Sequence, residues 1–352
     1  MRRFDRFNAK YNPLGQSVLR TVFLKTHNHI GGKYLAEVTQ EVMGDLKENK
    51  YSLVEWRLSV YGRDRHEWNR LARWVTKNKL ASPEIRWMIQ IPRLYSIYHK
   101  AGLVTCFQDM MTNIFEPLFR VTIDPSWDPE LHAFLNLVTG FDSVDDESKH
   151  EGGRDAEVPL PEDWDSEHDP PYYYQMHFIA ANLKSLNLLR RTRGLREFSF
   201  RPHSGEAGDI DHLAACLLTS ESINHGINLR HLPALEYVYY LAQIGLSVSP
   251  LSNHRLFVDY KSSPFLGFLR RGHNVTLSSD DPLILHFTRD SLLEEYVIAA
   301  QVWKLSPPEI AEIMRNSLRI SGFEEPYKRH WQGPAHVAPG PRGNDIFRTN
   351  VP

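Results

Sequence analysis

Histidine and acidic residues stand at the ends of three apolar segments in the second half of the chain. His203 and Glu206 follow one segment, His225 lies in the next, and Asp280 and Asp281 end the last. Imidazole and carboxylate groups that converge in this way can bind a metal, donate a proton and accept a proton. The pattern therefore predicts a metal-assisted catalytic site assembled from separate strands.

Each of these residues also has a simple structural interpretation when it is taken alone. A single histidine at a strand end is usually a hydrogen-bonded structural group. The sequence Asp280-Asp281-Pro282 is typical of a turn or a helix start, because Asp caps helices and Pro fits the first turn. The functional interpretation depends on all of these residues meeting at one place.

Such convergence requires a parallel sheet, and the sequence predicts one. Short apolar, β-branched or aromatic runs alternate with helix-like stretches, which is typical of strands joined by crossover helices. The predicted strands are 54–62, 85–92, 137–144, 197–203, 222–229, 245–250 and 274–280. We expect an α/β fold of the (β/α)₈ barrel type. A closed barrel needs eight strands, so either one strand is missing from this prediction or the chain begins after the first strand. The carboxyl ends of barrel strands share one face, where active sites form.

Local signals set the other boundaries. Ser291 and Ser306 each begin a predicted helix, the second with prolines in its first turn and a capping-box Glu309. The acidic stretch 142–171, which contains several Gly and Pro residues, is expected to be a surface insertion. We expect one barrel domain over residues 1–331 and a C-terminal tail over 332–352.

Composition excludes several classes of protein. Of the 352 residues, 41% are apolar and 24% charged, with a formal charge of −2. This is ordinary globular composition without the basic excess of a nucleic-acid-binding protein or a polybasic membrane surface. Two cysteines cannot build a disulfide framework. No apolar run suits a membrane span or a signal peptide, so we expect a soluble, cytoplasmic protein.

The order His203, Glu206, His225, Asp280-Asp281 resembles that of the adenosine and AMP deaminase family of metal-dependent hydrolases. Longer strings resemble the AMP deaminase branch over nearly the whole chain. They are RFDRFNAKYNPLG (3–15), YGRDRHEW (61–68), GFDSVDDESK (140–149), RPHSGEAG (201–208), YLAQIGLSVSPLSN (240–253), SSDDP (278–282) before HFT (286–288), EEYVIAAQVWKLS (294–306) and GNDIFRTNVP (343–352).

The resemblance implies zinc-dependent hydrolysis of AMP to IMP and ammonia in purine nucleotide salvage. It implies that His203 and Asp280 bind zinc and that Glu206 protonates purine N1. It implies that His225 is the general base for the attacking water, and that Asp281 contacts the substrate and helps hold that water. It also implies a homo-oligomer, with a tetramer as the family's form. The Pro-Cys-x-x-Cys signature of cytidine-type deaminases is absent.

The resemblance further implies which residues bind the substrate. They are Arg6, Phe7, Asn8, Ala9, Lys10, Tyr11, Glu206, Asp281, Pro282, Leu283 and Ile284. Arg6 and Lys10 carry the charge expected for a phosphate-bearing substrate, although a solvated basic turn would look the same. Ile284 replaces a residue that is usually Gln in the family, and an apolar side chain cannot make the hydrogen bonds of an amide.

The resemblance implies that the first strand of the barrel, which carries the family's His-x-His zinc motif at its end, is missing from this sequence and that this accounts for the count of seven strands. His27-Asn28-His29 has the same spacing, but it lies in a loop where the family has no metal ligand, so we expect surface imidazoles there. Catalytic zinc normally has three protein ligands, and only two are assigned. A chain shortened at both ends is therefore expected, and the alternative function is a catalytically impaired paralogue that binds nucleotide or joins deaminase oligomers.

Overall fold

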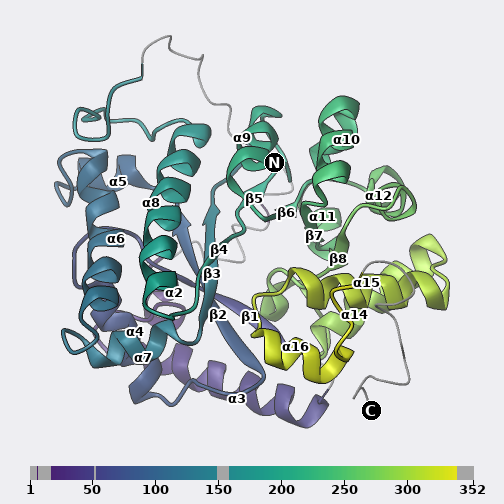
Figure 1. Cartoon of the computed structure of the whole chain (residues 1–352), viewed down its shortest axis with the longest axis horizontal. Helices are drawn as coiled ribbons and strands as arrows, with labels where there is room; N and C mark the ends of the chain where they lie inside the picture. Colours follow the sequence, from purple (N-terminus) through teal and green to yellow (C-terminus); the bar gives the residue numbers. More distant parts are fainter. Residues whose placement is uncertain (1–5, 7–16, 51–52, 149–157, 339–352) are drawn as a thin grey trace.

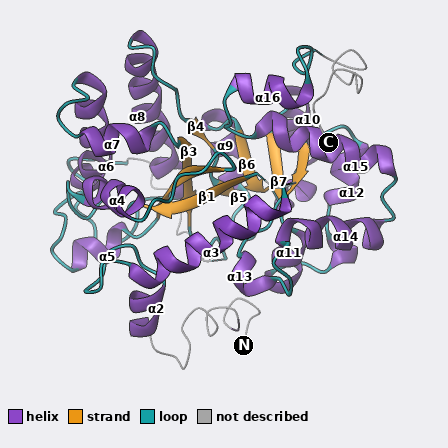
Figure 2. Ribbon diagram, turned by 90° about the horizontal axis from the view of Figure 1, so that it is seen from below, coloured by secondary structure: helices purple, strands orange, loops and turns teal. Residues whose placement is uncertain are grey.

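Parallel strands form the centre of the molecule, and helices surround them (Figures 1 and 2). The computed structural model describes residues 6, 17–50, 53–148 and 158–338. The strands are β1 (Val54–Ser59), β2 (Ile85–Pro92), β3 (Val138–Val144), β4 (Ser199–Phe200), β5 (His203–Ser204), β6 (Ser222–His225), β7 (Gly245–Val248) and β8 (Val275–Leu277). They form two parallel four-stranded sheets, with the orders β1-β2-β3-β4 and β5-β6-β7-β8.

The two sheets join through a single extended segment that contains both β4 and β5. Arg201 N donates to Phe141 O of β3 at 2.8 Å, and Asn224 N of β6 donates to Pro202 O at 2.9 Å. The segment therefore lies between β3 and β6. Pro202 interrupts the ladder because it has no N–H to donate. The described residues thus form seven strand positions, which confirms the predicted α/β fold and the seven predicted strand segments.

The sheet curls into a barrel. Arg57 of β1 donates from Nη2 to Asn224 Oδ1 of β6 at 3.0 Å, although β2, β3 and the β4–β5 segment lie between these two strands in the sheet. Among the described residues, β1 pairs only with β2 and β8 pairs only with β7. The described part of the barrel is therefore open between β1 and β8, which is where the eighth strand of a complete barrel would lie.

Several predicted strands end earlier than expected. The prediction of a strand over 222–229 is wrong beyond His225, where Gly226 (φ 66°) and the 3₁₀ helix η2 (Ile227–His231) follow. Likewise β1 ends at Ser59, β7 at Val248 and β8 at Leu277. Polar residues and turns follow each of these strand ends. The predicted segments were therefore longer than the hydrogen-bonded strands.

The helices lie outside the strands and pack on them through apolar faces. Those before β3 are α2 (Ser17–Phe23), α3 (Lys33–Asn49), α4 (Glu67–Lys77), α5 (Tyr95–Lys100), α6 (Phe107–Ile123) and α7 (Pro129–Leu135). Those after it are α8 (Tyr172–Thr192), α9 (Asp211–Thr219), α10 (Pro233–Ala242), α11 (Pro250–Leu256), η3 (Tyr260–Ser262), α12 (Phe265–Arg270), α13 (Pro282–Leu285), α14 (Ser291–Trp303), α15 (Pro307–Ile320) and α16 (Glu325–Gln332).

Both predicted helix starts are confirmed. Helix α14 begins at Ser291, and Ser306 caps α15 in a capping box with Glu309. The stretch predicted as an acidic insertion begins inside β3 and ends where α8 begins, and residues 149–157 lie outside the described part. Residues 339–352 of the predicted tail do so as well. No described helix combines the length and apolarity that crossing a bilayer requires.

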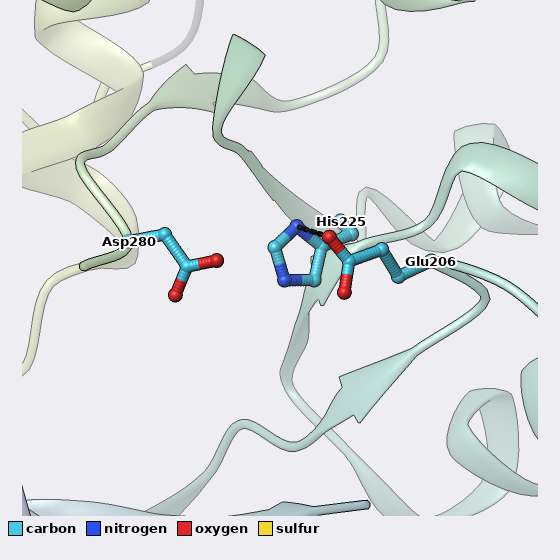
Figure 3. Close-up of side chains that lie close together, drawn as sticks. All are labelled: Glu206, His225 and Asp280. Carbon is cyan, nitrogen blue, oxygen red and sulfur yellow. Dashed lines mark ion pairs between the residues drawn. The ribbon is translucent and has the colours of Figure 1, made fainter. Parts of the chain in front are cut away.

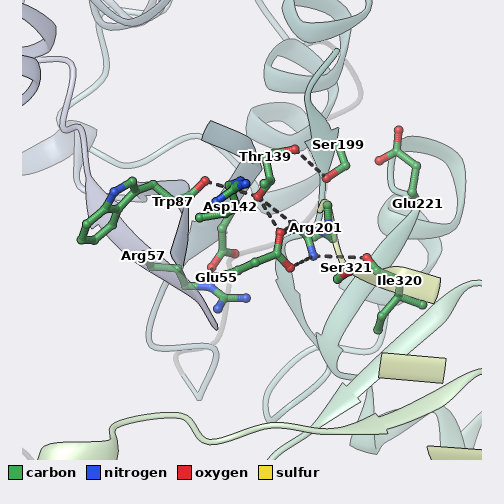
Figure 4. Close-up of polar contacts among 12 residues, drawn as sticks. Glu55, Arg57, Trp87, Thr139, Asp142, Ser199, Arg201, Glu221, Ile320 and Ser321 are labelled. Carbon is green, nitrogen blue, oxygen red and sulfur yellow. Dashed lines mark hydrogen bonds and ion pairs between the residues drawn. The ribbon is translucent and has the colours of Figure 1, made fainter. Parts of the chain in front are cut away.

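A buried ion pair ties the barrel interior to the segment after α15 (Figure 4). Arg201 donates to both carboxylate oxygens of Glu55, at 2.6 and 2.7 Å. Thr139 Oγ1 donates to Glu55 at 2.6 Å, and Gly322 N donates to the same oxygen at 2.9 Å. Burial by itself would raise the pKa of Glu55, but Arg201 and these donors outweigh it and lower the pKa from 4.5 to about 2.

We expect the Glu55–Arg201 ion pair to make the free energy of unfolding depend on pH in the acid range. Since the pKa of Glu55 is lower in the folded chain, its contribution is fully present above about pH 4.5 and is lost as pH falls towards 2. Glu55→Gln should destabilise the fold by roughly 3 kcal/mol at neutral pH, with the deficit shrinking towards pH 2. Urea unfolding of both chains across this range measures the difference. A deficit that does not change with pH would contradict the assignment.

Candidate active site

The residues predicted to take part in catalysis meet at the carboxyl ends of the strands in the sheet β5-β6-β7-β8. His203 lies on β5 and Glu206 follows it, while His225 is the last residue of β6. Asp280 follows β8, and Asn253 lies in α11 directly after β7. Parallel strands bring their carboxyl ends to one face, so four separate segments contribute to one site.

Glu206, His225 and Asp280 form its centre (Figure 3). Each offers one potential ligand atom, and these atoms lie within 4.8 Å of one another. His225 Nδ1 is 3.6 Å from Glu206 Oε1, and the imidazole lies between the two carboxylates. His225 also has a φ of 72°, in the left-handed region that a side chain disfavours. This is the kind of local strain that is found at functional sites.

Asn253 and Ser252 hold these groups from α11. Asn253 Nδ2 lies 2.8 Å from Glu206 Oε1, to which it donates, and 3.0 Å from His225 Nδ1. Ser252 Oγ donates to Asp280 Oδ2 at 2.6 Å. His225 Nε2 is buried and has no hydrogen-bond partner among the described residues. The second nitrogen of this imidazole is therefore available to an atom that binds in the site.

Burial and neighbouring charges separate the protonation states of the three groups. Burial, followed by the charge of Asp280, raises the pKa of Glu206 well above its usual value. Burial, followed by His203, lowers the pKa of His225 to about 4. A carboxylic acid that keeps its proton thus lies beside an imidazole that is neutral at physiological pH. Titratable neighbours with pKa values driven apart are typical of an acid and a base in catalysis.

Asp280 stays ionised although it is buried. Burial acts to raise its pKa, but the positive charges that His225 and His203 carry when they are protonated, together with the hydroxyl of Ser252, bring the pKa below its usual value. The hydrogen bond from Ser252 persists whatever the charge on the imidazoles. The site therefore keeps one carboxylate in the form that binds a metal cation.

His203 lies beside this group, with its ring centroid 5.1 Å from that of His225. It is not one of the three residues whose ligand atoms lie within 4.8 Å of one another. Its Nδ1 is 3.0 Å from Asp142 Oδ1 on β3, and Arg57 Nε donates to the other Asp142 oxygen at 2.6 Å. Metal-binding histidines usually engage a carboxylate through their second nitrogen. The contact with Asp142 thus engages Nδ1 of His203 and not its Nε2.

The predicted substrate residues are only partly placed. Asp281 directly precedes α13 (Pro282–Leu285), which contains the three residues predicted beyond it. Leu283 is exposed. Arg6 is exposed, and Phe7, Asn8, Ala9, Lys10 and Tyr11 lie outside the described residues. A pocket of about 390 Å³ opens beside Glu206, and Gly208, Ile227, Arg230 and Phe257 are among the residues that line it.

His27 and His29 are exposed in a turn between α2 and α3, as expected for surface imidazoles. Sequence reasoning missed the contacts of Asp142 and Arg57, and it included Asn253 only as the last residue of the string YLAQIGLSVSPLSN (240–253). Asp142 could have been found as the one charged residue in the predicted strand VTGFDSV. Arg57 gives no such signal.

Comparison with known proteins places these features in context. The family model described as AMP deaminase matches residues 1–352. The AMP deaminase of Dictyostelium discoideum is 53% identical over 349 residues, which cover 99% of this chain and 44% of that protein. The AMP deaminase of Arabidopsis thaliana is 54% identical over 350 residues, covering 99% and 42%. The chain therefore spans less than half the length of these relatives.

Solved structures support the fold alone. Arabidopsis ADAL complexed with GMP aligns with a TM-score of 0.52 at 14% identity, covering 84% of this chain and 75% of that one. A cog1816 amidohydrolase from Burkhoderia ambifaria with bound Zn gives a TM-score of 0.52 at 13% identity, covering 84% and 70%. The described chain has the α/β barrel of the deaminase and amidohydrolase proteins.

Proposed function

This chain belongs to the AMP deaminase family, and we propose that its site hydrolyses AMP to IMP and ammonia. The observation that carries the proposal is the close group of Glu206, His225 and Asp280, whose ligand atoms lie within 4.8 Å of one another. It combines a protonated acid, a neutral base and an ionised carboxylate. Hydrolytic removal of an amine from a purine ring needs a proton donor, a proton acceptor and an activated water.

Glu206 is the proposed proton donor. Burial keeps its carboxyl protonated, and Asn253 fixes one of its oxygens by a hydrogen bond of 2.8 Å. A proton delivered to N1 of the purine draws electrons from C6 and makes this carbon more electrophilic. The carboxyl can do this at neutral pH only because its pKa is raised, since an ordinary glutamate would already have lost the proton.

His225 is the proposed proton acceptor. Its lowered pKa, about 4, keeps the imidazole neutral, so it can take a proton from the attacking water. The buried Nε2, which has no partner among the described residues, is the nitrogen available for this step. Asp281, next to Asp280, is the proposed contact to the substrate.

The described residues offer part of the ligand set of a zinc site, two of the three protein ligands that catalytic zinc normally has. His203 and Asp280 would hold it, since imidazole nitrogen and carboxylate oxygen are usual zinc ligands, and Asp142 occupies Nδ1 of His203 at 3.0 Å. A bound zinc ion lowers the pKa of a coordinated water to about 7. The proposal extends to a cytoplasmic homo-oligomer that acts in purine nucleotide salvage.

Asp142 gives this assignment a test that is independent of turnover. Asp142→Asn removes the negative charge that orients His203. Burial acts against this charge, but His203 and Arg57 outweigh burial and hold the pKa of Asp142 at about 2. We expect the zinc affinity to fall by about 10- to 100-fold, as is usual when a carboxylate behind a histidine ligand is changed. Competition titration with a zinc-binding dye measures this. Unchanged zinc affinity in a folded variant would mean that His203 does not bind the metal.

The function itself is tested by ammonia release from the zinc-loaded chain. We expect AMP to yield IMP and ammonia, a chelator to stop the reaction, and adenosine to be the poorer substrate because Arg6 and Lys10 are proposed to bind the phosphate. A chain that binds AMP and zinc without releasing ammonia would favour the catalytically impaired paralogue. A preference for adenosine would refute the role of the two basic residues.

A further inference from the structure

A buried carboxylate that has no part in the proposed reaction contacts the backbone of residues 205–208. We call this segment, which carries Glu206, the catalytic loop. Glu147 follows β3, in the GFDSVDDESK string, and its side chain is 4% exposed. Gly205 N donates to its Oε2 at 2.7 Å, and Glu206 N approaches its Oε1 at 3.4 Å. One carboxylate therefore accepts from the amide of the proposed acid and from the amide before it. A charged acceptor makes stronger hydrogen bonds to backbone N–H groups than a neutral one does.

The backbone of Glu147 also lies directly against the same loop. Gly208 has a φ of 66°, and a Cβ added there would be 1.5 Å from the carbonyl oxygen of Glu147. Only glycine allows these two backbone segments to approach so closely. The loop that carries Glu206 is thus held on both sides of this residue, by hydrogen bonds at 205 and 206 and by close packing at 208.

A third contact joins Glu147 to helix α9. Its Oε2 lies 3.2 Å from His212 Nδ1 in α9. The His212 ring stacks on Tyr172 of α8, with centroids 4.0 Å apart and an interplanar angle of 12°. Tyr172 in turn donates to His203 O at 2.6 Å. Glu147 is therefore fixed to helices that also hold the strand from which the catalytic loop begins.

We propose that Glu147 is a positioning residue that sets the place of Glu206 relative to the purine ring. This inference rests on the proposed function of Glu206 and adds a residue to it. Because Glu147 acts on the loop backbone, it controls where the acid lies without touching substrate or metal. A displacement of the order of 1 Å at a catalytic group can lower the rate by about 10²-fold.

Three variants of the whole chain test the proposal. We expect Glu147→Ala to lower kcat for AMP by about 100-fold, with KM changed less than about threefold and zinc stoichiometry unchanged. Glu147→Gln keeps an oxygen that can accept from Gly205 N, so it should restore kcat to within about tenfold of the starting chain. The control is Asp146→Ala, the neighbouring carboxylate, which accepts from Ser148 N at 3.2 Å and should leave kcat unchanged.

If Glu147 only stabilised the fold, Glu147→Ala would lower the thermal stability. It would not lower kcat selectively over KM, and Glu147→Gln would not restore kcat. If Glu147→Ala fails to fold, Gly208→Ala displaces the loop while Glu147 stays intact, and it should give the same loss of kcat. A folded Glu147→Ala chain with unchanged kcat, or an equal loss in the Ala and Gln variants, would overturn the proposal.

Amide hydrogen exchange separates this inference from the proposed function. The Gly205 and Glu206 amides should exchange at least about tenfold faster in Glu147→Ala than in the starting chain, and Asp146→Ala should not change them. This result is expected whatever reaction the site catalyses. Faster exchange in a chain that does not deaminate AMP would refute the proposed function and keep the contact, whereas unchanged exchange would refute the positioning role itself.

Discussion

Replacement of Glu206 by Gln should lower kcat for AMP by about 10³-fold and leave zinc binding unchanged. Gln has nearly the same shape and can still accept the hydrogen bond from Asn253, which spans 2.8 Å. It has no acidic proton to give to the ring nitrogen. The loss should therefore fall on the chemical step, so that KM changes little. Spectrophotometric conversion of AMP to IMP and metal analysis of the same preparation measure both quantities.

The matched control is Asp209→Asn, which makes the same chemical change in the same loop. Asp209 accepts from Asp211 N at 3.2 Å and has no assigned role in the reaction, so its kcat should stay within about threefold of the starting chain, in the range of ordinary surface substitutions. A Glu206→Gln chain that retains more than about a tenth of the starting kcat would remove Glu206 from the role of acid.

The second large effect concerns the metal. Asp280→Asn should lower the zinc affinity by roughly 100-fold or more, because loss of a ligand exceeds the effect of changing a residue behind a ligand. Asn also cannot carry the charge that the Ser252 hydroxyl stabilises at 2.6 Å. Turnover should fall with zinc occupancy when zinc is limiting and recover in part when zinc is in excess. Zinc titration with turnover measured at each point follows both changes.

Asp290→Asn is the control for this experiment. Asp290 is exposed at the start of α14, ten residues after Asp280, and its side chain accepts a hydrogen bond from Asn49 of α3. Its zinc affinity and turnover should match those of the starting chain. If Asp280→Asn binds zinc at full stoichiometry under limiting zinc, the metal lies elsewhere, and the assignment of Asp280 as a ligand is wrong.

Local patterns in the sequence predicted much of the framework of the site. Apolar runs predicted each of the seven strand positions. They placed His203 and Asp280 at the ends of two predicted strands, and His225 inside a third that in fact ends at this residue. The capping box at Ser306 predicted a helix start for the same reason, because the residues that make it are neighbours in the chain. Such features need no knowledge of distant contacts.

Contacts between distant residues could not be predicted in this way. Asp142 meets His203 from 61 residues away, and Glu147 reaches the Gly205 amide across 58 residues. The curl of the sheet decides which residues meet, and no period in the sequence encodes it. The early end of β6 was missed because His225 adopts a positive φ of 72°, which is uncommon for a residue with a side chain.

The most direct test of the site follows the oxygen atom that enters the product. The zinc-loaded chain is supplied with AMP in water enriched in oxygen-18, and the IMP formed is examined by mass spectrometry while ammonia is assayed. Hydrolysis at this site predicts one ammonia per IMP and one labelled oxygen at C6, with both lost in Glu206→Gln. Bound AMP that stays unchanged, or ammonia released without labelled IMP, would contradict the account.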